Sequence, residues 1–311
     1  MTSAVPGPFR PLTRPDWLPR NQWPFQSFAV DTNSGVIAVT EAGSGPALLL
    51  VHAGTWSFIW RDLVSRLMAD FRCIFFDAPG NGQSSNVANN ATLEGASRAV
   101  AAVIEALGLE DFTLVAHDLG GPAALAALAS TPARVRGLVA MNTFGWRPSG
   151  AALRGMLAVM GSRTIREIDV LTGFVPALTA TSFGIGRHVG AAGRTVFRKG
   201  MKTAGRRAFH DYLRDAREGG GVYEKAAAAL AGPLARVPLL TIFGERNDPF
   251  GFQARWKKLY PDATQMVVKN GNHFPMCDEP DLVAGTIQEW YDKRIEGRWQ
   301  DSKATEKEKT A

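Results

Sequence analysis

Hydrophobic residues in the first quarter of the chain either alternate with polar ones or form short continuous runs. The two alternating segments predict a β-hairpin turned at residues 33–35, and the two continuous runs are typical of strands buried on both faces of a sheet. These predicted strands are Phe28–Asp31, Val36–Thr40, Ala47–His52 and Cys73–Asp77.

Apolar residues at helical spacing separate the next predicted strands. The predicted helices are Trp60–Ala69, Leu93–Leu107 and Ala123–Ala129, and the predicted strands are Phe112–His117 and Val135–Asn142. Strands that alternate with helices pair in parallel through right-handed crossovers. The pattern therefore predicts an α/β fold with a mostly parallel, doubly wound sheet.

The pattern changes after the sixth predicted strand. Residues 144–234 contain no strand-like run and place apolar residues at helical spacing, which predicts an inserted helical cap. Strands resume at Pro238–Phe243 and Gln265–Val268, followed by helices at Phe252–Leu259 and Leu282–Lys293. We expect a core of residues 26–143 and 235–297, an extended N-terminal arm over residues 1–25, and a disordered polar tail over residues 298–311.

The formal charge of +6 is concentrated in the predicted cap. Between Gly150 and Gly220, 12 basic residues accompany 5 acidic ones, so this segment carries +7 and the rest of the chain about −1. Two interpretations remain open: the basic side chains coat exposed helix faces, or part of them attracts an anionic substrate to a pocket. No nucleic-acid recognition motif accompanies them, so we expect no nucleic-acid partner.

Other features limit the location and the cofactors. The two cysteines, Cys73 and Cys277, form neither a disulfide framework nor a CxxC metal motif. The N-terminal segment lacks the apolar stretch of a signal peptide, and no apolar run approaches the roughly 20 residues that span a bilayer. We expect a cytoplasmic protein that acts on a small molecule, without a metal, a cofactor or a membrane partner. The sequence does not distinguish a monomer from an oligomer.

The most informative segment is Leu114–Pro122 (LVAHDLGGP), where a strand runs through a sharp turn into a helix. Small residues around Asp118 allow the strained turn of a nucleophile elbow, which presents one side chain at a helix N-terminus. A carboxylate there attacks saturated carbon and forms an alkyl ester, whereas attack on an ester or amide carbonyl would give a reactive anhydride. The alternative is that Asp118 merely caps the helix that follows.

Two later strand ends supply the remaining members of a catalytic triad. The first is followed by Asp248, with Glu245 as a weaker candidate, and the second by His273. The order nucleophile, acid, histidine is that of the α/β-hydrolases. His273, oriented by Asp248, would take a proton from the water that attacks the Asp118 ester. The alternative is that His273 only stabilises a turn.

Backbone groups near the elbow are candidates for an oxyanion hole. The N–H groups of Gly54 and Leu119 both follow strand ends and can point toward the Asp118 carbonyl. His52 and His117 are expected to orient loops rather than carry protons.

From Trp23 to about Trp290 the chain resembles the α/β-hydrolase fold, and more narrowly the haloalkane dehalogenases and the related epoxide hydrolases. The motifs that carry the resemblance are Thr55–Arg61 (TWSFIWR), Asp77–Ser84 (DAPGNGQS), His117–Pro122 (HDLGGP), Asn142–Trp146 (NTFGW) and Asn272–Phe274 (NHF). The resemblance implies an aspartate nucleophile and a covalent alkyl-enzyme ester.

The leaving-group site departs from both families. Haloalkane dehalogenases hold the halide with a Trp directly after the nucleophile and an Asn in the His-Gly-Asn-Pro loop, whereas these positions are Leu119 and Gly54 here. The resemblance therefore implies another indole N–H donor, for which Trp56 and Trp146 are the candidates.

Epoxide hydrolases instead protonate the epoxide oxygen with two cap tyrosines, and this resemblance implies Tyr212 and Tyr223. Three hypotheses follow: displacement of a leaving group such as halide on Asp118, epoxide hydrolysis on the same triad, or a ligand-binding protein without turnover.

Overall fold

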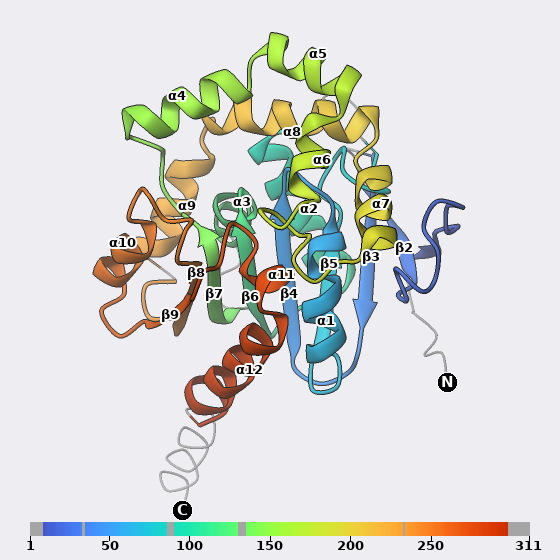
Figure 1. Ribbon diagram of the computed structural model, residues 1–311. Helices are drawn as coiled ribbons and strands as arrows, with labels where there is room; N and C mark the ends of the chain where they lie inside the picture. Colours follow the sequence, from blue (N-terminus) through green and yellow to red (C-terminus); the bar gives the residue numbers. More distant parts are fainter. Residues whose placement is uncertain (1–8, 33–34, 86–89, 130–134, 233, 298–311) are drawn as a thin grey trace, which may run out of the picture.

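The computed structural model describes residues 9–32, 35–85, 90–129, 135–232 and 234–297. Its centre is a sheet whose strands lie in the order β1-β2-β3-β5-β4-β6-β7-β8-β9 (Figure 1). Strand pairs from β4 onward are parallel, and β1, β2 and β3 add antiparallel pairs at one edge. The strands are β1 (Arg10–Pro11), β2 (Ser27–Thr32), β3 (Gly35–Ala42), β4 (Ala47–Ala53), β5 (Arg72–Phe76), β6 (Phe112–Asp118), β7 (Val135–Thr143), β8 (Leu239–Gly244) and β9 (Thr264–Val268). The predicted mostly parallel α/β sheet is confirmed.

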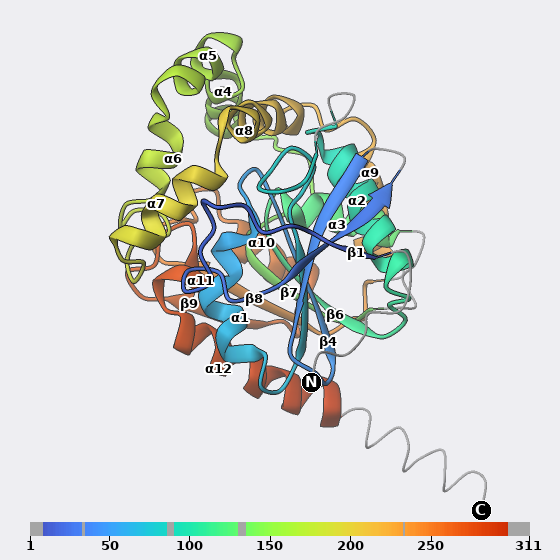
Figure 2. The ribbon, with the colours of Figure 1, turned by 90° about the vertical axis from the view of Figure 1, so that its right-hand side faces the viewer.

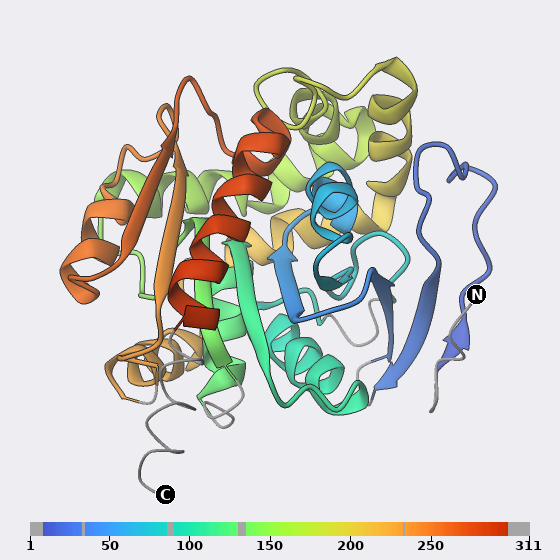
Figure 3. The same cartoon turned by 90° about the horizontal axis from the view of Figure 1, so that it is seen from below.

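Helices cover both faces of this sheet because its central strands are apolar on both sides. Seen from below, α12 (Pro280–Tyr291) and α2 (Leu93–Ala106) lie on opposite sides of the strands (Figure 3). α1 (Arg61–Leu67) packs beside α12, and α3 (Gly120–Leu128) packs against α2. Two hydrophobic clusters result, one on each face.

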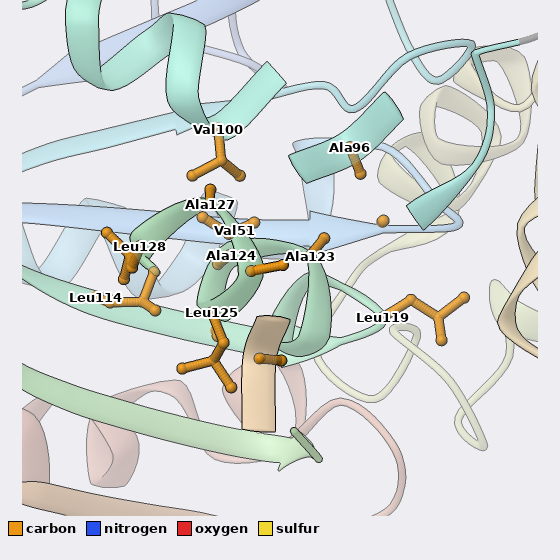
Figure 4. Packing of buried hydrophobic residues seen from close by; sticks show 14 of the residues in the cluster. Val51, Ala96, Val100, Leu114, Leu119, Ala123, Ala124, Leu125, Ala127 and Leu128 are labelled. Carbon is orange, nitrogen blue, oxygen red and sulfur yellow. The ribbon is translucent and has the colours of Figure 1, made fainter. Parts of the chain in front are cut away.

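Helix α3 lies close to the sheet because its residues are small. Ala123, Ala124 and Ala127 are buried and face Val51 of β4 and Val100 of α2 in one cluster (Figure 4). Short side chains bring the helix near the strands, and this places its N-terminus beside the end of β6.

The insertion between β7 and β8 is helical, and most of it lies across one end of the sheet (Figures 1 and 2). The first five helices are α4 (Ala151–Met160), α5 (Arg163–Thr172), α6 (Phe174–Thr179), α7 (Ala191–Gly200) and α8 (Thr203–Ala216). The sixth, α9 (Val222–Ala231), packs against α3. The predicted cap covers residues 144–234. Its last helix, α9, thus belongs to the helix layer on the sheet and not to the cap.

The N-terminal arm is packed against the core. β1 pairs with β2, and Trp23 and Phe25 are buried, with the Trp23 ring against Trp56. Residues 1–8 and the predicted tail at 298–311 lie outside the described residues. None of the helices in the described ranges has the length and apolar composition needed to cross a membrane.

Candidate active site

Asp118 ends β6 in a strained turn. Its φ is 50°, in the left-handed region that residues other than glycine rarely adopt, and α3 begins two residues later. The glycines after it make this turn possible: a Cβ on Gly120 would lie 2.4 Å from the Val51 carbonyl oxygen, and one on Gly121 would lie 2.0 Å from Thr143 Oγ1. The structure therefore has the predicted sharp turn from strand to helix, with the carboxylate at the helix N-terminus.

His273 faces this carboxylate from the loop between β9 and α11 (Pro275–Asp278). Its Nε2 lies 3.3 Å from Asp118 Oδ2, and both side chains are partly exposed, by 33% and 26%. Partial exposure leaves room for a water molecule or a substrate between the cavity and the imidazole. The structure thus brings together two of the three predicted triad members.

The third predicted member, Asp248, does not contact His273. Its two carboxylate oxygens accept hydrogen bonds from Phe252 N (2.7 Å) and Gln253 N (2.9 Å). These are the first N–H groups of α10 (Phe252–Leu259), which lack partners within the helix and attract a carboxylate. The prediction that Asp248 orients the imidazole is therefore wrong in this structure, because the start of α10 binds the carboxylate.

The side-chain amide of Asn247 contacts the His273 imidazole in place of a carboxylate. Asn247 Nδ2 lies 3.0 Å from His273 Nδ1. The weaker candidate acid, Glu245, accepts a hydrogen bond from Asn270 N and is exposed. Asn247 was not among the predicted site residues, although it directly precedes Asp248 in the same loop.

The main chain of His273 is held by two buried side chains. Its carbonyl oxygen lies 2.8 Å from His117 Nε2 and 2.8 Å from Asn142 Nδ2. Asn142, at the end of β7 with φ 35°, also donates to Asn272 O and accepts from Gly244 N. Its amide thus joins the loops after β8 and β9, a role that the sequence analysis did not assign.

His52 and His117 belong to a series of hydrogen bonds in which the donor and the acceptor of each bond can be assigned. Thr55 donates its main-chain N–H to His52 Nε2 at 3.1 Å, so that nitrogen carries no proton. His52 Nδ1 then donates to His117 Nδ1 at 3.0 Å, and His117 Nε2 donates to the His273 carbonyl oxygen. Burial lowers the pKa of His52 to about 3 and holds the pKa of His117 well below its usual value. Both rings are therefore neutral, and the prediction that they orient loops is confirmed.

A cavity of about 420 Å³ opens above Asp118 and His273, between the strand ends and the cap. Most of its lining residues are apolar, and eight of them come from cap helices α4 and α8 and from the loop before α10. The apolar lining residues are Leu119, Phe144, Leu153, Met156, Leu157, Met160, Phe209, Leu213, Phe243, Pro249, Phe250, Phe252 and Phe274. Among the described residues, no lysine or arginine lines it.

The four residues predicted to bind substrate do not line this cavity. Trp56 donates its indole N–H to Phe197 O, and Trp146 packs between Phe252 and Trp256. Their rings complete the packing between the core and neighbouring helices, so these two predictions are wrong.

The tyrosine predictions are also wrong. Tyr212 donates its hydroxyl to Pro79 O at 3.0 Å, and Tyr223 donates to Ala216 O at 2.6 Å. Both side chains are almost completely buried, with exposed fractions of 0% and 2%. Their hydroxyl groups satisfy main-chain carbonyls away from the cavity, since a buried phenol requires a partner.

The predicted oxyanion donors, the N–H groups of Gly54 and Leu119, lie close to the Asp118 carboxylate in the chain or in the sheet. Ala53 pairs with Asp118 in the register of β4 and β6, so Gly54 begins the loop beside the elbow. Leu119 follows Asp118 at the N-terminus of α3 and lines the cavity, as does Thr55. Their donation to an oxyanion remains a prediction.

The comparisons with known proteins agree with this architecture. A family model described as the alpha/beta hydrolase fold matches residues 46–158. The structure of haloalkane dehalogenase DbeA from Bradyrhizobium elkani superposes with a TM-score of 0.74 at 23% sequence identity, covering 88% of this chain and 99% of that one. The chain has the α/β-hydrolase fold.

Two curated relatives resemble this α/β-hydrolase over most of its length. Haloalkane dehalogenase 2 of Mycobacterium tuberculosis is 28% identical over 287 residues, which cover 88% of this chain and 98% of that protein. Cis-3-alkyl-4-alkyloxetan-2-one decarboxylase of Shewanella oneidensis is 25% identical over 85% of this chain and 88% of that protein. The matches indicate that the chain is a hydrolase resembling the haloalkane dehalogenases.

Acidic neighbours hold many of the basic side chains of the α/β-hydrolase cap. Arg166 pairs with Asp211 at 3.0 Å, and Arg207 pairs with Glu167 at 2.8 Å. Together with the apolar lining of the cavity, these pairs support the interpretation that the positive charge coats the cap. Within the described ranges, no group of histidine, cysteine or acidic side chains is arranged to hold a metal ion.

Proposed function

We propose that this hydrolase displaces a leaving group from a saturated carbon by attack of Asp118. A carboxylate oxygen forms a bond to the carbon while the leaving group departs with the bonding electron pair. His273 Nε2 then takes a proton from water, and the oxygen of that water attacks the ester carbonyl carbon of Asp118. The ester opens as the imidazolium returns a proton to the departing alcohol. The carboxylic acid left on Asp118 then releases the second proton of the water to solvent, which regenerates the carboxylate.

One arrangement carries the proposal: a carboxylate at the elbow, an imidazole 3.3 Å away, and an apolar cavity around both. A hydroxyl nucleophile in this position would favour acyl transfer, but a carboxylate is suited to attack on saturated carbon. Apolar walls remove water from the carboxylate and strengthen its interactions inside the cavity. Hydrolysis of the ester then needs a base beside the same oxygen, where His273 lies.

The cavity favours an uncharged, apolar substrate, with haloalkanes as the first candidate class. Its volume of about 420 Å³ and its aliphatic and aromatic lining suit an alkyl chain. The resemblance to haloalkane dehalogenase 2 points to the same class. The N-terminus of α3, where Leu119 lies, is the positive end of a helix and would stabilise a departing halide.

Epoxide hydrolysis is less well supported because it requires a proton donor at the epoxide oxygen. The two tyrosines that the resemblance suggested donate to main-chain carbonyls outside the cavity. Displacement of a group that leaves as an anion needs no such donor.

A second candidate substrate is a cis-3,4-dialkyl oxetan-2-one, as in the name of the Shewanella relative. One observation favours it: the indoles of Trp56 and Trp146 lie away from the cavity lining, so neither can hold a halide. Attack of Asp118 on the ring carbon would break the ring C–O bond, and the leaving carboxylate would stay attached to the substrate. Loss of carbon dioxide with expulsion of Asp118 would then give an alkene.

The test is product analysis with purified enzyme. 1-Bromobutane and 1-chlorohexane are expected to give halide and alcohol, and an Asp118→Asn variant is expected to release none. Asp70→Asn, a change at an exposed position, is the matched control and should retain activity. Alkene and carbon dioxide from an oxetanone, without halide release, would favour the second candidate. No product from either class would contradict the proposal.

A further inference from the structure

At Nδ1, the imidazole of His273 contacts an amide and not a carboxylate. Asn247 Nδ2 lies 3.0 Å from Nδ1, while the two carboxylates of the same loop bind main-chain N–H groups, Asp248 at α10 and Glu245 at Asn270. The end of β7 also carries an amide, Asn142, whose hydrogen bonds are to main-chain atoms. In the part of the chain that the structure describes, the base has no acidic partner at Nδ1.

The replacement of a carboxylate by an amide at Nδ1 affects which nitrogen of His273 carries the proton. To take a proton from water, Nε2 needs a free lone pair, so the proton of the neutral ring must be on Nδ1. A carboxylate accepts only, and therefore fixes that form. An amide offers both an N–H donor and a carbonyl acceptor, which exchange places by a half-turn of the side chain. Asn247 thus accommodates either form of the ring.

The charge of the ring is affected as well. Ester hydrolysis turns His273 into an imidazolium, and the titratable groups around it are Asp118 at Nε2 and the buried rings of His117 and His52. Asp118 loses its negative charge once it is esterified, and the two histidines are neutral. A neutral amide at Nδ1 leaves the imidazolium without an adjacent negative charge.

We propose that Asn247 makes hydrolysis of the Asp118 ester the slow step, so that the ester accumulates during turnover. This inference rests on the proposed function. Formation of the ester needs the Asp118 carboxylate but no base, and so it is independent of Asn247. Asn247 is a positioning residue, because it acts through His273.

The experiment compares wild-type enzyme, Asn247→Asp and Asn270→Asp, with 1-bromobutane as the probe. Asn270 is exposed and lies in the neighbouring loop, so its substitution adds the same charge without contact with His273. Each enzyme is mixed with excess 1-bromobutane and quenched over time, and the ester is followed by intact mass spectrometry. His273→Phe serves as the reference that forms the ester and cannot hydrolyse it.

We expect wild type and Asn270→Asp to show a rapid burst of halide and a large fraction of ester-bound enzyme in the steady state. Asn247→Asp should form the ester at the same rate but hydrolyse it at least about tenfold faster, since loss of a carboxylate from a triad costs about 10⁴ in kcat. The new carboxylate stabilises the imidazolium, so the acidic limb of the hydrolysis rate should move to higher pH.

Two results would overturn the inference while the proposed function stands. One is an ester on His273→Phe together with no ester on wild-type enzyme during turnover. The other is equal hydrolysis rates in wild type and Asn247→Asp, with both proteins folded by circular dichroism. Absence of the ester on His273→Phe would instead contradict the haloalkane reaction itself, and this inference would fail with it.

Discussion

The imidazole of His117 binds the main chain of His273, with Nε2 2.8 Å from the carbonyl oxygen. His117 is in turn hydrogen-bonded to His52, and His52 to the main chain of Thr55. These hydrogen bonds link the loop after β4 to the loop that carries His273. The imidazole that we propose as the base is therefore positioned through its backbone as well as through its side chain.

His117→Phe should impair both stability and turnover. The substitution leaves the buried Nδ1–H of His52 without its acceptor, and we expect the free energy of unfolding to fall by about 1–3 kcal/mol. Displacement of the His273 loop should slow hydrolysis of the ester and lower kcat by about tenfold. Because that step is the slow one, KM should fall with kcat and kcat/KM should stay nearly constant. Urea denaturation and steady-state kinetics provide the two measurements.

The control for this variant is His188→Phe, which removes an imidazole contact with the Asp278 carbonyl oxygen outside the cavity lining. It should keep the wild-type kcat. An equal loss of kcat in both variants would show that His117 has no special connection with the site.

His52 and His117 should remain neutral from about pH 5 to about pH 8. Nitrogen-15 NMR of the rings is expected to show His52 protonated on Nδ1 and His117 on Nε2 throughout this range. The pKa of His52 is lowered from 6.5 to about 3, so the unfolded state binds more protons between these values. The free energy of unfolding should therefore fall as the pH drops below about 6.5. Titration of either ring within the range would contradict the assigned chain of donors.

Asp248→Ala separates helix capping from catalysis. Loss of the two hydrogen bonds to the start of α10 should lower the free energy of unfolding by about 1 kcal/mol. The kcat should stay within about threefold of wild type, whereas loss of a triad carboxylate costs about 10⁴. A collapse of kcat in a folded variant would restore Asp248 as the acid.

The sharp turn at Asp118 could be predicted from the sequence because it is a local feature. The strand before Asp118 and the small residues after it are adjacent in the chain, and the turn follows from them. The position of the Asp248 carboxylate could not be predicted in this way, because its binding depends on where α10 begins. Its immediate neighbour, Asn247, faces the imidazole instead.

Positions in and near the cap were harder to predict for a related reason. The side-chain donors of Trp56, Tyr212 and Tyr223 suggest a contact with substrate. Each of these donors instead binds a main-chain carbonyl that only the folded packing brings near. Long-range contacts of this kind leave no periodic signal in the sequence. The apolar residues of α4 and α8 that do line the cavity could be recognised as helical but not as cavity walls.

Tyr212→Phe and Tyr223→Phe test the assignment of these hydroxyl groups. Each change removes one buried hydrogen bond, and the free energy of unfolding should fall by about 1 kcal/mol. Since neither hydroxyl faces the cavity, kcat should be unchanged for any substrate. Selective loss of diol formation from an epoxide in either variant would revive the epoxide hydrolase hypothesis.

The most direct test of the covalent mechanism is intact mass spectrometry of His273→Phe after incubation with 1-bromobutane. Without the imidazole at Asp118 Oδ2, water is not activated and the ester should persist. We expect a mass increase equal to one butyl group less one hydrogen, located on Asp118 by peptide mapping and absent from the double variant with Asp118→Asn. An unmodified His273→Phe protein, under conditions where wild-type enzyme releases bromide, would contradict attack by Asp118.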